Sequence, residues 1–341
     1  IELKAEKIDD TDIVCRVING GIISDRKAIN VPGVHLSLPF LSDVDRRDLE
    51  FAMKTGFDFF ALSFVRCAED VLEVRRLQKE HNNTSKLIAK IESQEGVENL
   101  DAIIDVADGI MVARGDMGVE IPFEKVPVVQ KDMISKCLKS GKFVIVATQM
   151  LESMTHNPRP TRAEVNDVAN AIFDKTSAVM LSGESAAGDY PVEAVKTMSR
   201  ICHEIEKTTT TGKFEITYNG SNLASSIACA ACSIASVINA DAIIPVSLSG
   251  STIRKVSGFR PNIDIIGCST NERVCRETSL MWGVTPVLIT EQEDGEALIN
   301  EVINKCKTAG VIKSGNRVVI VAGFPLRIAG ATNMIRVVDV E

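Results

Sequence analysis

The sequence KLIAKIE occupies residues 86–92, and its pattern decides the class of the fold. Its core is apolar and has the length of a buried strand, while Lys90 and Glu92 add charge at its carboxyl end. A helical pattern follows at residues 93–107, and residues 109–116 (GIMVARGD) form the next apolar run. Short apolar strands that alternate with helices of about ten to fifteen residues predict βαβ units and a parallel sheet.

The same alternation extends in both directions and covers residues 44–190. It predicts further strands at residues 59–65, 143–150 and 178–184, and further helices at residues 45–56, 68–82, 123–141 and 161–175. The strand cores are apolar, but their carboxyl ends carry Ser63, Lys90, Glu92, Arg114, Asp116, Thr148, Gln149, Ser182 and Glu184. One polar cluster per βα unit, always at the same end, is typical of the site of an α/β barrel or a doubly wound sheet. We favour a partial TIM (β/α)8 barrel, because no GxGxxG turn follows a strand.

The two ends of the chain follow other patterns. Residues 1–32 are predicted to form short strands at 12–18, 22–24 and 28–31 with a hairpin turn at residues 19–21 (NGG), which indicates the remnant of a small all-β domain. After a polar linker, a second α/β domain is expected, with strands at residues 242–246, 264–267, 284–289, 317–322 and 334–340 and helices at 223–240, 272–282 and 296–309. The predicted domains are therefore residues 1–32, 33–208 and 221–341.

Composition excludes several classes of function. With 38 Lys+Arg against 46 Asp+Glu, the net charge is −8, which disfavours general binding of nucleic acid. No apolar stretch approaches the roughly 20 residues of a membrane span. The nine cysteines are an odd number and favour reduced thiols in the cytoplasm. The closest pair, Cys229 and Cys232, lies in a helical pattern and indicates small core residues.

The start of the chain carries a separate expectation. Residue 1 is Ile1, and residues 1–7 resemble the middle of a β segment rather than a signal or transit peptide. We therefore expect the chain to be the C-terminal part of a longer protein.

The charged residues at the strand ends suggest chemistry on phosphate. Lys90 and Glu92 share a face of one strand because they are two residues apart, and burying them is costly unless they are paired or bound. Glu92 and Asp116 could place two carboxylates on one Mg²⁺ or Mn²⁺, with phosphate oxygens and water completing its coordination. Lys90 would then aim a fixed positive charge at a transferring phosphoryl group or a developing enolate.

The turn after the next strand offers a second anion-binding element. Residues 114–116 (RGD) are expected to expose backbone N–H groups, and Gly115 would let an anion approach closely. A simpler alternative is that Lys90 and Glu92 only form salt bridges with Arg114 and Asp116 in the barrel layer. The hydroxyls of strand ends, taken alone, often only satisfy loop backbone.

Several segments resemble the pyruvate kinase family, in its order and spacing. Residues 87–97 (LIAKIESQEGV) resemble its active-site signature. The other matching segments are residues 27–33 (KAINVPG), 62–66 (LSFVR), 109–118 (GIMVARGDMG), 146–154 (VATQMLESM), 157–164 (NPRPTRAE) and 180–190 (MLSGESAAGDY). Together they cover most of residues 12–205, and the second domain is similar to the family's C-terminal domain.

The resemblance implies a specific reaction and specific roles. Pyruvate kinases transfer the phosphoryl group of phosphoenolpyruvate to ADP and give pyruvate and ATP, in the last step of glycolysis. Lys90 matches the lysine that stabilises the phosphoryl and enolate charge. Glu92 and Asp116 match the ligands of the divalent metal. Thr148 matches the threonine that orients the substrate beside the proton-transfer path.

Further roles follow from the same resemblance. The backbone of Gly115 and Asp116 matches the part that receives the substrate carboxylate, and Ser63 and Arg114 match supporting positions of the site. Lys27 matches a lysine near the nucleotide phosphates. The K⁺ ligands, an arginine and much of the nucleotide site belong to a family region that precedes this chain, so we expect the chain alone to be inactive. A cytoplasmic homotetramer is also implied, with residues 158–164 near the contact between barrels.

Residues 247–252 (SLSGST) resemble the family loop that binds the phosphate of a sugar-phosphate effector. The candidate effector residues are Ser247, Ser249, Gly250, Ser251 and Thr252. Serine and glycine before a helix suit phosphate. However, residues 323–327 (GFPLR) lack the Trp-Arg-Pro of the animal forms that fructose-1,6-bisphosphate activates, so an ordinary strand-to-helix turn stays an alternative.

Two other functions remain possible on the sequence alone. A Mg-dependent aldolase of the phosphoenolpyruvate-binding barrels also uses Glu and Asp with an enolate, but it leaves the second domain and residues 157–164 unexplained. A noncatalytic regulatory or scaffold fragment would keep the fold without the chemistry.

Overall fold

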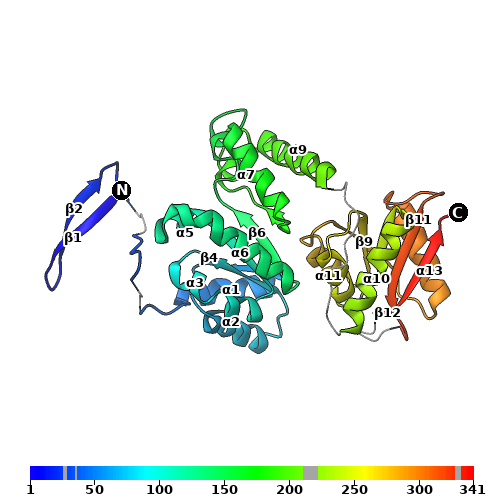
Figure 1. The fold of residues 1–341 in the computed structure, drawn as a ribbon. Coiled ribbons are helices and arrows are strands. Elements are labelled where there is room, and N and C mark those ends of the chain that lie inside the picture. The colour runs from blue at the N-terminus through cyan, green and yellow to red at the C-terminus, as the bar shows by residue number, and fades with distance from the viewer. Residues whose placement is uncertain (26–28, 35–36, 210–221, 327–331) are drawn as a thin grey trace.

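The structure is a computed structural model that describes residues 1–25, 29–34, 37–209, 222–326 and 332–341. In this part of the chain two five-stranded sheets and one two-stranded sheet are present (Figure 1). No helix among the described residues is both long and apolar enough to span a bilayer.

The first five-stranded sheet is parallel and has the order β3-β4-β5-β6-β7. Its strands are β3 (Phe59–Leu62), β4 (Lys86–Ile91), β5 (Gly109–Ala113), β6 (Phe143–Ala147) and β7 (Ala178–Val179). Its helices are α1 (Asp43–Thr55), α2 (Ala68–Glu80), α3 (Gln94–Glu98), α4 (Leu100–Val106), α5 (Arg114–Glu120), α6 (Val126–Lys139), α7 (Arg162–Phe173), α8 (Gly183–Ala186) and α9 (Pro191–Thr209), with short 3-10 turns at Phe123–Lys125 and Glu152–Thr155. The predicted alternation of strand and helix, and the parallel sheet, are confirmed.

The two faces of this sheet bury different residues. On β4, Leu87, Ala89 and Ile91 join the main core under the helices. Ile88 points to the other face and packs with Met111 and Ile145 in a smaller cluster. Because side chains alternate along a strand, Lys90 and Glu92 continue the face of Ile88 beyond that cluster. The charged side chains of Lys90 and Glu92 therefore lie at the carboxyl edge of the sheet, as predicted.

Several predicted element boundaries in this region are wrong. The strand predicted at residues 178–184 ends at Val179, and Gly183 begins the short helix α8. β5 ends at Ala113 and α5 begins at the next residue, whereas the sequence predicted strand through Asp116. The single helix expected at residues 93–107 is two helices that meet at Asn99. The side-chain amide of Asn99 donates a hydrogen bond to the carbonyl oxygen of Arg66 over 2.9 Å, which ties this break to the preceding βα loop.

The N-terminal region forms one antiparallel hairpin of β1 (Glu2–Ile8) and β2 (Ile13–Asn19). The expectation of β structure at residues 1–7 is confirmed, but the hairpin turn is not at residues 19–21. It lies at residues 9–12, where the N–H of Asp9 donates to the carbonyl oxygen of Asp12 over 2.8 Å. Asn19 instead donates across the ladder to Glu2, over 2.8 Å. Residues 22–24 and 29–31 form no strand, and residue 28 lies outside the described residues.

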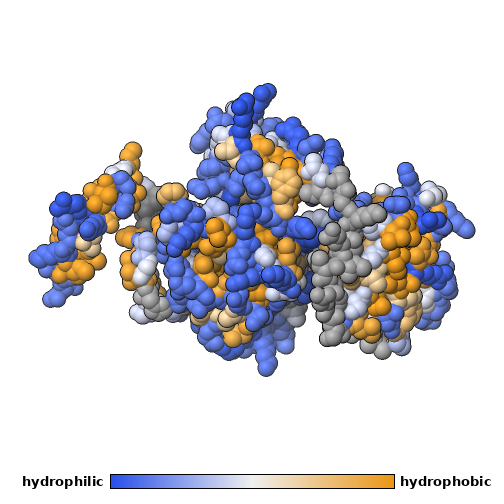
Figure 2. All heavy atoms as spheres, viewed as in Figure 1, coloured by the Kyte–Doolittle hydropathy of each residue, from blue (hydrophilic) through white to orange (hydrophobic). Residues whose placement is uncertain are grey.

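The hairpin keeps its apolar side chains at the surface. Leu3, Ile8, Ile13 and Val17 are all exposed. Figure 2 shows this as a hydrophobic surface over the hairpin.

The second five-stranded sheet has the order β10-β9-β8-β11-β12, with β12 antiparallel to β11. Its strands are β8 (Ala242–Pro245), β9 (Asp264–Ser269), β10 (Val284–Leu288), β11 (Arg317–Gly323) and β12 (Thr332–Asp339). Its helices are α10 (Leu223–Val237), α11 (Ser251–Gly258), α12 (Glu272–Thr278) and α13 (Gly295–Thr308). Helices α10 and α11 cover one face and α13 covers the other. The second α/β region is confirmed, while the boundaries drawn at residues 32 and 208 stay predictions.

The cysteine prediction for this region is also confirmed. Cys229 and Cys232 are free, buried residues of α10. Burial raises the pKa of Cys232 to about 12, so its thiol stays protonated at neutral pH.

Candidate active site

Lys90 is held by two side chains at the carboxyl edge of the first sheet. Its Nζ donates to Ser63 Oγ over 2.8 Å and lies 2.9 Å from Glu92 Oε1. The Glu92 side chain is 2% exposed and the Lys90 side chain is 24% exposed. The ammonium group is therefore fixed by a buried anion while part of it still faces outward.

Glu92 is anchored a second time by the loop after β3. Its Oε2 accepts a hydrogen bond from the backbone N–H of Phe64 over 2.6 Å. Phe64 has a φ of 51°, in the left-handed region that phenylalanine rarely adopts. Strained backbone of this kind costs about 1–3 kcal/mol and persists where the surroundings enforce it. Here it turns the Phe64 N–H toward the carboxylate.

Thr148 organises the neighbouring strand ends. Its Oγ1 accepts a hydrogen bond from the backbone N–H of Gly115 over 2.8 Å and donates to the carbonyl oxygen of Ala147 over 2.6 Å. Thr148 and Gln149 both have positive φ, of 66° and 54°. The Gly115 N–H is therefore engaged by Thr148, and the expectation that the turn at residues 114–116 exposes it is wrong.

Arg114 pairs with an acid other than Glu92 or Asp116. Its guanidinium lies 2.7 Å from the carboxylate of Asp167 on α7 and donates to the carbonyl oxygens of Ala147 and Thr148 over 3.2 Å and 2.6 Å. The alternative predicted one salt-bridge layer of Lys90, Glu92, Arg114 and Asp116. In the structure Lys90 pairs with Glu92, whereas Arg114 pairs with Asp167. Arg114 instead braces the backbone that carries Thr148.

Asp116 lies in the first turn of α5 and is half-buried. One turn later, burial and the charge of Asp116 raise the pKa of Glu120. Glu120 was missed by the sequence reasoning, although its position four residues after Asp116 places both on one helix face.

Two family models match the chain. The model for the pyruvate kinase barrel domain matches residues 1–195, and the model for the pyruvate kinase alpha/beta domain matches residues 225–338. The chain belongs to the pyruvate kinase family. This membership accounts for the second sheet, which the aldolase alternative left unexplained.

Curated pyruvate kinases resemble the chain over its whole length. The chain is 45% identical over 345 residues to the pyruvate kinase of Clostridium acetobutylicum, an alignment that covers 100% of this chain and 73% of that protein. It is 44% identical over 342 residues to the pyruvate kinases of Staphylococcus aureus strains MRSA252 and USA300. These two alignments cover 99% of this chain and 58% of each relative.

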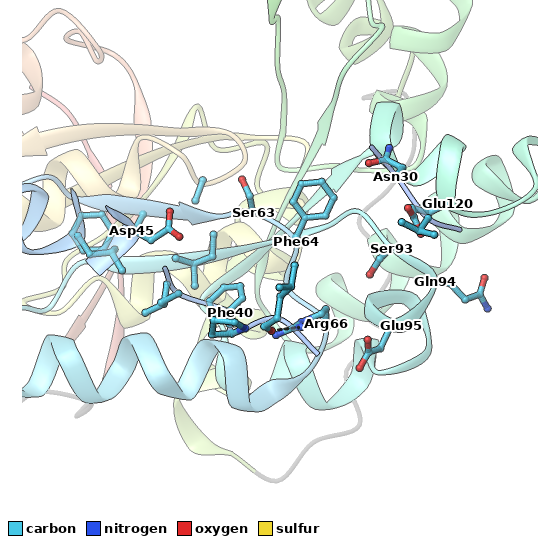
Figure 3. A pocket seen from close by; sticks show the side chains of 18 of the residues that line it. Asn30, Phe40, Asp45, Ser63, Phe64, Arg66, Ser93, Gln94, Glu95 and Glu120 are labelled. Atoms are coloured by element: carbon cyan, nitrogen blue, oxygen red, sulfur yellow. Dashed lines mark hydrogen bonds between the residues drawn. The ribbon is translucent and has the colours of Figure 1, made fainter. Parts of the chain in front are cut away.

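A cavity of about 1110 Å³ borders the candidate site on the side of β3. Figure 3 shows Ser63, Phe64 and Glu120 among the side chains that line it. Lys90, Glu92 and Thr148 are not among its lining residues, so the cavity meets the site through Ser63 and its neighbour Phe64. Its volume slightly exceeds the roughly 300–1,000 Å³ of typical small-molecule pockets.

The carboxylates suit a divalent cation in number and type. In the described part of the chain, no group of three or more His, Cys, Asp and Glu side chains is placed to hold a metal. Two carboxylates, here Glu92 and Asp116, nevertheless match what Mg²⁺ uses when substrate phosphates and water supply its other ligands.

Glu184 holds the last two strand ends together and has no place among the predicted roles. Its Oε1 accepts the N–H of Leu151 over 3.0 Å, and its Oε2 accepts the N–H of Ser182 over 2.7 Å. Its side chain is fully buried. The sequence placed Glu184 at a strand end but gave no signal for these partners, which lie in two loops.

The predicted effector residues differ in their exposure. Thr252 is buried, and its Oγ1 lies 2.7 Å from Thr332 Oγ1. Ser247 is also buried and accepts the N–H of Thr252 over 3.4 Å, whereas Ser249 is exposed and Ser251 is half-buried. Gly250 has a φ of 77°, which favours glycine at this turn.

The predicted nucleotide residue, Lys27, lies outside the described residues.

Proposed function

We propose that this chain carries the phosphoryl-transfer site of a pyruvate kinase, which converts phosphoenolpyruvate and ADP to pyruvate and ATP. One observation carries the proposal: the Lys90 ammonium is fixed between Ser63 and the buried Glu92 at the carboxyl edge of a parallel sheet. A charge that is already in place stabilises a developing anion without reorganisation. Such preorganised stabilisation is usually the largest contribution to the rate enhancement of an enzyme.

The proposed chemistry follows from charge movement. The bond between phosphorus and the enol oxygen breaks, a new bond forms to the terminal phosphate oxygen of ADP, and the electron pair stays on the enol oxygen. Lys90 faces this charge on both the moving group and the oxygen left behind. A proton then reaches the terminal carbon and gives pyruvate, and Thr148 is the proposed residue that orients the substrate for this step.

Glu92 and Asp116 are the proposed ligands of a Mg²⁺ or Mn²⁺ ion. A bound divalent cation supplies positive charge that neutralises phosphate oxygens and orients them. The family also uses K⁺, for which we assign no ligand among the described residues. Ser63 is proposed to hold Lys90, Arg114 to hold the Thr148 loop, and the first turn of α5 to receive the substrate carboxylate.

The chain spans 58% of the length of the Staphylococcus aureus relatives, so activity, substrates and assembly of the whole protein are proposals. We propose that it acts on phosphoenolpyruvate and ADP in the cytoplasm, assembles as a homotetramer, and contacts the nucleotide phosphates through Lys27.

The first test separates charge stabilisation from metal binding. We expect Lys90→Met to lower phosphoenolpyruvate-dependent ATP formation by roughly a hundred- to a thousand-fold, because one preorganised charge is lost. Binding of Mn²⁺, followed by electron paramagnetic resonance, should persist in Lys90→Met and weaken in Glu92→Gln and Asp116→Asn. The exposed Lys139→Met and Glu124→Gln are the matched controls.

Two results would contradict the proposal. One is full turnover in Lys90→Met. The other, which applies even if the chain alone does not turn over, is unchanged Mn²⁺ affinity in both carboxylate variants.

The effector proposal is tested at the exposed residue of the loop. Because Thr252 is buried, its substitution would test packing rather than binding. We expect Ser249→Glu to weaken binding of a sugar bisphosphate at least tenfold in a calorimetric titration, since a carboxylate repels phosphate. Asn300→Glu adds the same charge on α13 and should leave binding unchanged. Equal affinity of wild type and Ser249→Glu would favour an ordinary turn.

A further inference from the structure

A small cavity lies where the barrel region meets the second α/β region. It has a volume of about 20 Å³, and Lys142, Phe143, Arg254, Arg260 and Trp282 are among its lining residues. A shared apolar cluster, which includes Phe143 of β6, Ile253 of α11 and Met281, joins the two regions beside it. The cavity is just above the size that holds one water molecule or an ion of similar radius.

Three cations meet at this cavity, and none of them has a carboxylate partner in the part of the chain that the structure describes. Lys142 Nζ donates to the carbonyl oxygen of Ala107 over 2.7 Å. The Arg254 guanidinium lies 5.8 Å from the centre of the Phe143 ring, and among the described residues it has no hydrogen bond or ion pair. Arg260 lies 5.2 Å from the centre of the Trp282 ring and bonds to hydroxyl and carbonyl oxygens.

The nearest acidic groups do not neutralise this cluster. The charges of Asp108 and Asp105 raise the pKa of Lys142, but the Asp108 carboxylate is also 2.5 Å from Arg75. The pKa of Lys142 is nevertheless lowered, because burial and the charges of Arg254 and Arg75 outweigh the effect of those two acids. Burial also lowers the pKa of Arg260 to about 9. These directions show a junction that disfavours the positive charge it contains.

One donor in the cluster is left over. Arg260 Nε is buried and has no hydrogen-bond partner among the described residues, although the other guanidinium nitrogens are used. Nη1 donates to the Ser257 carbonyl oxygen over 2.9 Å, and Nη2 donates to Ser177 Oγ over 3.1 Å. An unsatisfied buried donor costs about 1–3 kcal/mol, so a group that accepts from it would be stabilised there.

We propose that this junction, defined by Lys142, Arg254 and Arg260, binds a small anion. The volume suits a halide, or a single oxygen of a phosphate or carboxylate that enters from outside. The anion would accept from Arg260 Nε and offset the charge of the other two cations. Because Arg260 also bonds to Ser177 across the junction, a bound anion would tighten the contact between the barrel region and the second region.

Crystals of the protein soaked in bromide test the position of the site. We expect an anomalous difference peak within hydrogen-bond distance of Arg260 Nε. In solution, thermal unfolding at constant ionic strength should shift upward with bromide or chloride replacing gluconate, which is too large for the cavity. Inorganic phosphate forms a separate arm: stabilisation by phosphate but not by halide would assign the site to an oxyanion.

Variants decide whether the three cations make the site. Arg254→Met should weaken the anion at least tenfold, because one charge is lost while no hydrogen bond within the protein is broken. Arg260→Lys keeps the charge but lacks the Nε donor, and should also weaken it. The exposed Arg47→Met is the control. Absence of a peak and of any anion effect on unfolding would overturn the proposal, and so would a peak with equal affinity in Arg254→Met, which would be an adventitious ion only.

Discussion

Individual residues at the site are held by partners that are distant in the sequence. Lys90 and Glu92 could be predicted as a pair, because two residues on a strand share a face. The partner of Arg114 could not be predicted, since Asp167 lies 53 residues away on another helix. The same is true of Gly115, whose N–H is taken by a hydroxyl 33 residues away. Local pattern therefore identified the charged residues, and the tertiary contacts decided which of them are free to meet a ligand.

Thr148→Val tests how much the Thr148 hydroxyl, which caps the start of α5, contributes to the free energy of unfolding. Ala113, the residue before this helix, has no side-chain cap, and Thr148 Oγ1 accepts from Gly115 in its place. We expect Thr148→Val to lower the free energy of unfolding by about 1 kcal/mol, as loss of a helix cap does. Chemical denaturation measures the change.

Thr148→Ser keeps the hydroxyl and should recover most of the lost stability. Equal destabilisation by valine and serine would mean that the methyl group, and not the hydrogen bond, matters.

At the scale of elements, the strands and most helices followed from apolar periodicity, and the errors fell at boundaries. The turn of the first hairpin was misplaced because Asn-Gly is a strong turn signal, whereas residues 9–12 (DDTD) make the turn in the structure. The helix at residues 93–107 was predicted as continuous because its break depends on a bond from Asn99 to the Arg66 carbonyl oxygen. No periodicity reports such a contact.

Helix α7 begins with a capping box that also fixes the loop before it. Glu164 accepts hydrogen bonds from Thr161, at the N-cap, and from the backbone and hydroxyl of Ser153. Burial raises the pKa of Glu164, but these bonds outweigh it and hold the pKa below its ordinary value of 4.5. A lowered folded pKa means that the carboxylate stabilises the fold above pH 4.5, and that this stabilisation is lost as pH falls through the folded pKa.

We therefore expect Glu164→Gln to lower the free energy of unfolding by about 1 kcal/mol at neutral pH. The difference from wild type should shrink in acid, which urea unfolding at a series of pH values can follow. The exposed Glu152→Gln is the control. A difference that is constant with pH would show that the charge of Glu164 does not contribute.

At the scale of the whole molecule, charged side chains join the second α/β region to the barrel region. Glu277 of α12 lies 3.4 Å from Lys86 Nζ and 2.9 Å from Arg273 Nε. Arg273 donates to Ser85 over 3.2 Å, and Arg276 lies 2.8 Å from Asp58. The sequence suggested two α/β regions but gave no signal for this contact, because its partners come from unrelated segments.

Glu277→Gln tests whether this contact couples the two regions. Glu277 is buried, so neutralising it leaves Lys86 and Arg273 without their carboxylate, at a cost of about 1–3 kcal/mol. We expect the calorimetric unfolding transition to broaden or divide in two, with the second region unfolding separately. Glu272→Gln, an exposed acid on the same helix, should leave the transition unchanged. A single unshifted transition in Glu277→Gln would show that the coupling lies elsewhere.

Strand β4 carries both a contact to the second α/β region and a contact of the candidate site. Lys86, at its first residue, meets Glu277 of the second region, while Lys90 meets Glu92 and Ser63. Lys90 is four positions further along the strand than Lys86, about 13 Å at the usual rise. A strand that is hydrogen-bonded to neighbours on both sides hardly stretches, so it moves along its axis as a rigid unit. A displacement of Lys86 by α12 would therefore shift the strand backbone that carries Lys90, whose ammonium we propose to face the phosphoryl group.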